Sequence, residues 1–240
     1  MTATLNPPNG SAPQGPSRSR TVWTIAVAVV GVLVVTAFGL LIARGSGMTA
    51  ADLAVVTSLN QLHVGVLGFL TTAVYSAVSP VPAIAITAVA AAAIWLVSRR
   101  LLTAVTFAIV VAFTWLPSAL VKAVVHRPRP DVHQLAHPFA IQPSDASYPS
   151  GHEVFIATVV VVAFLMSRGV LARILIGAFG AVAILFVGFA LVSDGVHYPT
   201  DVAASVLWTL TVARAIMLLW RSFVVPELER RVAGRRRVTP

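Results

Sequence analysis

The sequence predicts an all-α fold, a polytopic membrane helical bundle with six transmembrane helices and short external helices. Hydrophobic residues make up 58% of the 240 positions and charged residues only 10%, whereas soluble domains carry about 25% charge. The mean hydropathy is +0.89. The apolar residues also gather in long runs, and a hydrocarbon core of about 30 Å takes around 20 helical residues to cross.

The elements are expected in the following order. Residues 1–20 are rich in Pro, Ser, Gly and Asn without apolar periodicity, which predicts a disordered N-terminal tail. The apolar run 22–43 is longer than the apolar part of a signal peptide, so we expect a retained anchor. Further spans are expected near residues 80–98, 101–121, 152–167, 174–192 and 201–220. Residues 21–221 then form one six-span membrane domain, and 222–240 form a basic cytoplasmic tail.

Segment 64–79 leaves the number of spans open between six and seven, because it is short, moderately polar and followed by Pro80. Positive charge favours six. With the N-terminus inside, six spans place the arginines near residues 18–20, 99–100, 168–173 and 221–237 on the inner side, as the positive-inside bias requires. Residues 44–79 then form an external segment, with two short helices on or in the bilayer surface. We therefore expect a multi-pass protein of the cell membrane (plasma or inner membrane) with both termini cytoplasmic.

The net charge of +9 suggests nucleic-acid binding in a soluble protein. Here the basic residues flank apolar runs, where they orient helices, so no nucleic-acid partner is expected. The chain has no cysteine, which excludes disulfides, thiol nucleophiles and cysteine metal sites.

The first polar motif follows the third span and runs from Lys122 through Arg127 and Arg129 to Pro130. Two prolines with intervening arginines force an extended path. A lysine point charge and an arginine fork complement the oxygens of a phosphate. The alternative is an interfacial anchor whose basic side chains reach lipid headgroups.

The second motif is Tyr148-Pro-Ser150-Gly151-His152-Glu153, just before the fourth span. Ser150 followed by Glu153 matches a capping box, so Ser150 is expected to start that helix. A helix start presents unpaired N–H groups and a partial positive charge, and Gly151 lets the backbone approach an anion closely. The alternative is an ordinary capped helix with a histidine on its surface.

The third motif, Gly195-Val-His197-Tyr-Pro-Thr-Asp201, opens the last span. His197 and Asp201 are four residues apart across a helix start, which places them on one face. A carboxylate that holds one imidazole nitrogen leaves the other free as a nucleophile or base. The alternative is a simple pair in the first helical turn.

Together these motifs resemble those of the type-2 phosphatidic acid phosphatase superfamily, which includes lipid phosphate phosphatases, undecaprenyl-diphosphate phosphatases and vanadium haloperoxidases. Lys122, Arg129 and Pro130 match its first motif, Pro149 through His152 its second, and His197 with Asp201 part of its third. The resemblance covers roughly residues 21–221 and implies a site on the outer membrane face.

The resemblance also implies the role of each residue. The phosphate docks among Lys122, Arg129, Ser150 and Gly151, with Arg127 beside them. His197, oriented by Asp201, attacks phosphorus and forms a phosphohistidine, while His152 protonates the leaving group and then activates water. No cofactor is implied. No metal is expected either, since His126, His133 and His137 lack a ligand-like carboxylate pattern.

One departure from the family's third motif concerns its Ser-Arg pair, in whose place this chain has Ala190 and Leu191. Loss of one preorganised donor to a developing oxyanion typically costs about 10²–10³ in rate. Glu153 and Asp194 are also expected near the anion site, where they repel a phosphate unless Arg127 or Arg129 pairs with them. A weakened site is therefore expected.

The expected function is hydrolysis of a lipid phosphate such as phosphatidic acid, phosphatidylglycerophosphate or a polyprenyl diphosphate. The alternative is a catalytically weakened family member that binds a phospholipid or acts as a membrane scaffold, because Leu191 replaces the arginine. A transporter is disfavoured, since the predicted spans are nearly free of charge. Phosphotransfer to an acceptor other than water stays open, and so does the oligomeric state. The expected partners are the lipid phosphate substrate and membrane lipids.

Overall fold

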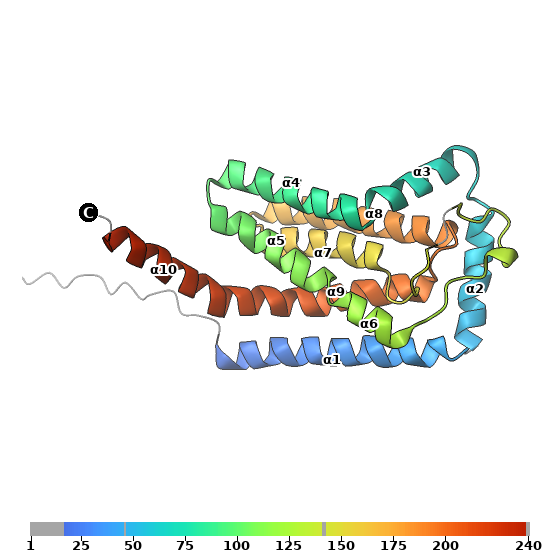
Figure 1. The fold of residues 1–240 in the computed structure, drawn as a ribbon, viewed down its shortest axis with the longest axis horizontal. Coiled ribbons are helices and arrows are strands. Elements are labelled where there is room, and N and C mark those ends of the chain that lie inside the picture. The colour runs from blue at the N-terminus through green and yellow to red at the C-terminus, as the bar shows by residue number, and fades with distance from the viewer. Residues whose placement is uncertain (1–16, 46, 141–142, 239–240) are drawn as a thin grey trace, which may run out of the picture.

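The computed structural model describes residues 17–45, 47–140 and 143–238, with side chains described as far as Arg231. Every regular element in these residues is helical (Figure 1). The longer helices are α1 (Arg18–Ala43), α4 (Pro80–Ser98), α5 (Leu101–Trp115), α7 (Gly151–Met166), α8 (Val170–Ser193) and α9 (Pro199–Leu219). The others are α2 (Gly47–Asn60), α3 (Gly65–Ala77), α6 (Ser118–Val125), α10 (Val225–Val238), a 3₁₀ turn η1 (Val132–Gln134) and a π-helical segment η2 (Trp220–Val224).

The long helices are apolar on their outer surfaces as well as inside the bundle. Val89 on α4 is 69% exposed, and Phe179 and Leu185 on α8 are each 72% exposed. In water such surfaces would be unfavourable, whereas hydrocarbon is the solvent that they match. The chain is therefore a multi-pass membrane protein built as an α-helical bundle, as the sequence predicted.

The number of spans is less simple than the predicted six. Five helical stretches are long and apolar enough to cross a membrane: 18–43, 80–98, 101–125, 170–193 and 199–231. The predicted span 152–167 is α7, a shorter apolar helix of 16 residues. It lies inside the bundle alongside α8 and α9 (Figure 1). At 1.5 Å per residue α7 extends about 24 Å, less than the bilayer core. Six spans remains a prediction.

The buried core is centred on α7, where Val154, Phe155 and Val162 have no exposed surface. Phe155 joins a cluster with residues of α5 and α8, while Val154 joins one with α1, α6 and α9. Gly39 of α1 packs directly against the ring of Tyr148, so a side chain there would collide with it. The loop before α7 is thus held between α1 and the bundle.

Helices α2 and α3 are the two short helices expected within residues 44–79. Figure 1 shows α2 lying across one end of the bundle, crosswise to α1. It contacts α1, α8 and α9, whereas α3 contacts α4 and α8. The two helices therefore cover one end of the bundle, where the three polar motifs also lie.

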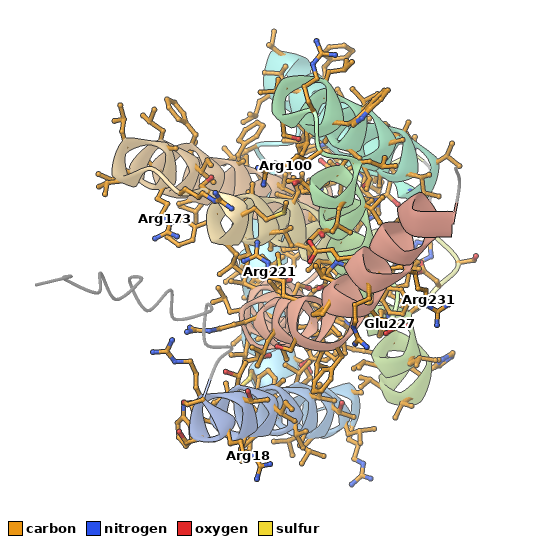
Figure 2. The ribbon with its side chains drawn as sticks, turned by 90° about the vertical axis from the view of Figure 1, so that its left-hand side faces the viewer. Arg18, Arg100, Arg173, Arg221, Glu227 and Arg231 are labelled. Carbon is orange, nitrogen blue, oxygen red and sulfur yellow. The ribbon has the colours of Figure 1, made fainter. Side chains whose placement is uncertain are left out.

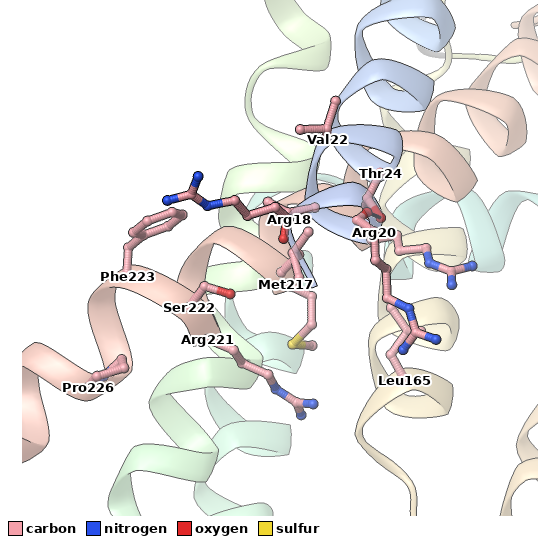
Figure 3. Close-up of a pocket in the computed structure, with 13 residues that line it drawn as sticks. Arg18, Arg20, Val22, Thr24, Leu165, Met217, Arg221, Ser222, Phe223 and Pro226 are labelled. Atoms are coloured by element: carbon pink, nitrogen blue, oxygen red, sulfur yellow. Dashed lines mark hydrogen bonds between the residues drawn. The ribbon is translucent and has the colours of Figure 1, made fainter. Parts of the chain in front are cut away.

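The opposite end of the bundle is rich in arginine. Arg18, Arg100, Arg173, Arg221 and Arg231 all lie at this end (Figure 2). A cavity of about 750 Å³ here is lined by arginines of α1, α9 and η2 together with apolar side chains. Within it the side chains of Arg18 and Arg221 point in different directions (Figure 3).

The structure describes part of each predicted tail. Ser17 caps α1, with its Oγ accepting a hydrogen bond from the Arg20 N–H at 3.4 Å, so residues 18–20 are helical although we expected them in the tail. The other predicted tail residues, 1–16, lie outside the described residues. The helix of the last span continues through η2 into α10, so the predicted tail 222–240 is helical as far as Val238.

Candidate active site

The first motif leaves the bundle from α6. Lys122 sits in the last turn of this helix, which ends where His126 takes a positive φ of 51°. The Pro-rich segment that follows carries Arg129 across to the third motif. Arg129 Nη1 donates to the Val196 carbonyl at 2.6 Å and lies 3.2 Å from His197 Nε2. The segment thus places an arginine fork beside the predicted nucleophile.

The second motif starts α7 as predicted. Ser150 is fully buried, and its Oγ accepts the Glu153 N–H at 3.4 Å. The Tyr148 hydroxyl donates to the Val35 carbonyl at 2.7 Å, and Trp115 Nε1 donates to the Gly151 carbonyl at 3.0 Å. These bonds fix the start of α7, whose first N–H groups face the end of the bundle that carries Lys122.

The third motif forms the turn between α8 and α9. Gly195 has a φ of +72°, a conformation that side-chain-bearing residues rarely adopt. His197 Nδ1 lies 3.5 Å from Asp201 Oδ2, which also accepts the Tyr198 N–H at 2.9 Å. Since the other ring nitrogen, Nε2, faces an arginine donor, the proton of a neutral imidazole belongs on Nδ1. The Nε2 lone pair then points away from Asp201.

The protonation state of His197 follows from its surroundings. Its side chain is fully buried, and burial lowers the pKa of the imidazole well below its usual value. The positive charges of Arg129 and Lys122 lower that pKa further. His197 is therefore neutral at neutral pH, as a nitrogen nucleophile must be.

The three motifs converge at one end of the bundle. Besides the contact of Arg129 with His197, the rings of His152 and His197 have centroids 6.3 Å apart. Lys122 and Gly151 line the same cavity. Lys122 and Arg129 are further joined through a shared carboxylate, that of Asp145. The structure therefore brings together Lys122, Arg129, His197 and the start of α7.

Arg127 lies apart from this cluster, in a buried ion-pair network. Its Nη1 donates to Asp201 Oδ1 at 2.6 Å, and its Nη2 donates to Asp52 Oδ2 at 2.8 Å. Thr200 also donates to Asp52 and accepts from Arg127. Both ends of the guanidinium thus hold carboxylates. Arg127 therefore contacts Asp201 and Asp52 in this structure, whereas the sequence led us to expect it beside the phosphate.

Helices α2 and α3 supply residues that sequence reasoning missed. Asp52 belongs to the Arg127 network, and the ring of Tyr75 lies 4.3 Å from that of His152. His63 Nδ1 lies 2.9 Å from Asp194 Oδ1. Asn60 binds the Ser193 and His137 carbonyls at 2.9 Å each. Asp52 and Asn60 are polar residues in a segment of apolar helices, and this was the one feature of the sequence that could have indicated their place in the site.

The acids expected near the anion site have other surroundings. Asp194 pairs with His63, whereas Glu153 is buried without a hydrogen-bond partner among the described residues. The capping box is therefore only half formed, because Ser150 caps the Glu153 N–H and the Glu153 carboxyl does not return the bond. Leu191 is fully buried in the apolar cluster around Phe155, so its side chain supplies no donor to the site.

An apolar groove leads from the flank of the bundle to this cluster. The cavity measures about 680 Å³ and lies between α4, α5 and α6. Its long walls are apolar, with Ile84 and Ile109 among them, while Lys122, Asp145 and Gly151 line its polar end. A ligand with a long apolar part and an anionic head matches this gradation of the lining.

Comparison with known proteins agrees with these motifs. The PAP2 superfamily profile matches residues 99–224, slightly more than half of the chain. A solved structure of similar fold is titled the first transmembrane PAP2 type phosphatidylglycerolphosphate phosphatase from Bacillus subtilis. It aligns with a TM-score of 0.64 and 18% identity over 83% of this chain and 94% of that chain. No curated protein matches the sequence. The matched residues include all three motifs, and the chain belongs to the PAP2 superfamily.

Proposed function

We propose that this chain is a membrane phosphatase that removes phosphate from a lipid phosphate through a phosphohistidine intermediate. The observation that carries the proposal is the distance of 3.2 Å between Arg129 Nη1 and His197 Nε2, beside the start of α7. A neutral imidazole nitrogen next to two cations and a helix start is the arrangement that attack on an anionic phosphorus centre requires.

In the first step, the phosphate is held by Lys122, Arg129 and the start of α7 at Ser150 and Gly151. His197 Nε2 attacks phosphorus, the bond from phosphorus to the lipid oxygen breaks, and the imidazolium form of His152, which the bound dianionic phosphate stabilises, donates its proton to that oxygen. Asp201 stabilises the positive charge that develops on His197. Arg127 acts through Asp201, because it holds the other carboxylate oxygen.

In the second step, His152 takes a proton from water, and the oxygen of that water attacks phosphorus. The bond between phosphorus and Nε2 breaks, which returns His197 to its neutral form and releases inorganic phosphate. Replacement of one difficult displacement by two easier ones is the general benefit of covalent catalysis. These steps use side chains of this chain alone.

The substrate class follows from the groove. Its apolar walls suit one or more hydrocarbon chains that enter from the lipid side, while the headgroup phosphate reaches Lys122 at the polar end. Phosphatidic acid, phosphatidylglycerophosphate and polyprenyl diphosphates, undecaprenyl diphosphate among them, share this chemistry. We take these lipid phosphates as the candidate substrates of the membrane domain formed by residues 21–221.

Orientation follows from the separation of charge between the two ends of the bundle. The arginine-rich end carries the beginning of α1 and the whole of α10, and the positive-inside bias assigns it to the cytoplasm. The motifs lie at the opposite end. The site therefore faces outward from the cell membrane, with both termini cytoplasmic.

The proposal is tested by phosphate release from a panel of lipid phosphates by the purified protein. We expect release from at least one of them, and loss of that release in His197→Ala and in His152→Ala at unchanged expression. Full turnover in either variant would contradict the proposed mechanism. If the wild-type protein releases phosphate from none of the lipids, the proposed function is wrong.

A second candidate function is suggested by Leu191, whose apolar side chain stands where the family's third motif has arginine. Such a chain would bind a lipid phosphate without hydrolysing it. Leu191→Arg separates the two readings, with Leu191→Met as an uncharged control. An enzyme short of one donor gains turnover, at most the 10²–10³-fold that such a donor typically provides. Tight lipid binding without any turnover in both variants would support the binding protein.

A further inference from the structure

The two cations of the first motif are already occupied by a carboxylate of this chain. Lys122 Nζ lies 2.6 Å from Asp145 Oδ2, and Arg129 Nη2 lies 2.6 Å from Asp145 Oδ1. Arg129 Nε also donates to the Asp145 backbone carbonyl at 2.9 Å. One carboxylate therefore bridges both groups that are proposed to hold the substrate phosphate, in the manner of the phosphate itself.

Asp145 is an anion throughout the physiological pH range. Partial burial acts to raise its pKa, but the hydrogen bonds and charges of Lys122 and Arg129 outweigh burial and hold that pKa well below its usual range. The Asp145 side chain is 55% exposed, whereas those of Lys122 and Arg129 are 17% and 9% exposed. The carboxylate thus covers the cations from the solvent side.

The same arrangement lies beside the nucleophile. His197 is fully buried, and the Arg129 guanidinium that Asp145 holds lies 3.2 Å from its Nε2. A phosphate that takes the place of the Asp145 carboxylate on Arg129 therefore arrives next to Nε2. Asp145 also lines the polar end of the groove, where a lipid headgroup arrives.

We propose that Asp145 is an intramolecular competitor for the substrate phosphate, so that only groups held more strongly than its carboxylate occupy the two cations. This inference rests on the proposed function of the same site. A terminal phosphate monoester carries two charges and displaces the carboxylate from both cations. A phosphodiester carries one charge, the same as Asp145, and gains little from the exchange. Asp145 is therefore a specificity-determining residue that protects the diester phospholipids of the surrounding bilayer from the site.

The experiment measures binding without turnover. Inorganic phosphate at pH 8 serves as the dianionic probe and dimethyl phosphate as the monoanionic probe, with the shift of the thermal unfolding midpoint of the detergent-purified full chain as the readout. Loss of two partly exposed ion pairs predicts that Asp145→Asn binds phosphate about 3- to 30-fold tighter than the wild type. Because dimethyl phosphate must displace the same carboxylate, its affinity should rise by a similar factor, which brings binding of this monoanion into the measurable range.

Asp131→Asn is the matched control, because Asp131 lies on the same loop and its hydrogen-bond partners among the described residues are the His133 N–H and the Gln134 side chain. It should bind both probes like the wild type. Asp145→Ala serves as a second variant, and the midpoint without phosphate reports whether each variant is folded. Unchanged or weaker phosphate binding by both folded Asp145 variants overturns the proposal. If the Asp145 variants bind phosphate more tightly but no lipid is hydrolysed, the competitor role of Asp145 stands and the proposed phosphatase function is wrong.

Discussion

At the residue scale, the Arg127 network shows how the site is held together. Arg127 is 1% exposed, Asp52 5%, and Asp201 not at all, and the Arg127 guanidinium also lies 3.9 Å from the centre of the Tyr198 ring. One cation serves two carboxylates that come from α2 and α9. Its removal leaves both carboxylates buried without their partner, which is costly in any low-dielectric setting.

Arg127→Met should therefore destabilise the protein by about 3–5 kcal/mol, the usual cost of breaking a buried ion pair by removing one partner. Thermal unfolding in detergent measures this change. Arg18→Met, at the exposed start of α1, is the control and should shift the midpoint little. Arg127→Lys keeps the positive charge but not the planar guanidinium, so its unfolding midpoint should lie between those of Arg127→Met and Arg18→Met. Equal midpoints for Arg127→Met and Arg18→Met would show that the network does not stabilise the fold.

At the element scale, α2 and α3 are more than surface helices. With the turn between them, they carry Asp52 to Arg127, Asn60 to the end of α8, His63 to Asp194 and Tyr75 to His152. The external segment thus forms one wall of the site, built from residues that precede the first motif by more than forty positions. Because the Tyr75 ring lies over the imidazole, it limits the orientations that His152 can adopt.

Tyr75→Leu should lower kcat about tenfold or more, because the ring that fixes the general acid and base is lost. Tyr75→Phe keeps the ring and should restore most of that loss, which a purely polar role of the hydroxyl would not allow. Steady-state turnover with the preferred lipid phosphate gives both values. Equal turnover in Tyr75→Leu and the wild type would assign Tyr75 to packing alone.

The same elements show what could be predicted from the sequence. Long apolar runs predicted α1, α4, α5, α8 and α9, because in lipid a helix must satisfy its own backbone hydrogen bonds. Motif residues predicted the helix starts at Ser150 and near His197. The partners of Arg127 and the role of Asp145 could not be predicted, since they depend on how distant segments pack. The basic residues around Arg127 in the sequence did not indicate that Arg127 would form ion pairs with two buried carboxylates.

At the scale of the whole molecule, the buried position of His197 makes the stability of the fold depend on pH. The folded state keeps this imidazole neutral, whereas an unfolded histidine has a pKa of about 6.5. As the pH falls below that value, the His197 imidazole becomes protonated in the unfolded state but stays neutral in the folded state. The contribution of His197 to the free energy of unfolding therefore decreases. Asp145 adds nothing in this window, since it stays ionised in both states.

The difference in stability between the wild type and His197→Gln, measured from unfolding midpoints in detergent, should therefore shift against the wild type from pH 7.5 to pH 5, by the equivalent of about 1.4 kcal/mol for each unit of pKa lowering that is traversed. The difference separates His197 from the other buried titratable groups. His197→Gln removes the titrating group and should show a smaller decrease over the same range. If the wild type and His197→Gln lose the same stability, then His197 is not kept neutral by the folded structure.

The central claim is that His197 is the nucleophile of a phosphate site assembled from three distant motifs. It is tested most directly by mixing the purified protein with phosphatidic acid or the preferred lipid, quenching in alkali within the first turnover, and mapping the phosphoryl group by mass spectrometry. We predict phosphohistidine at His197, and no labelled residue in His197→Ala. Turnover without a phosphoryl group on His197, or with that group on another residue, would contradict the account.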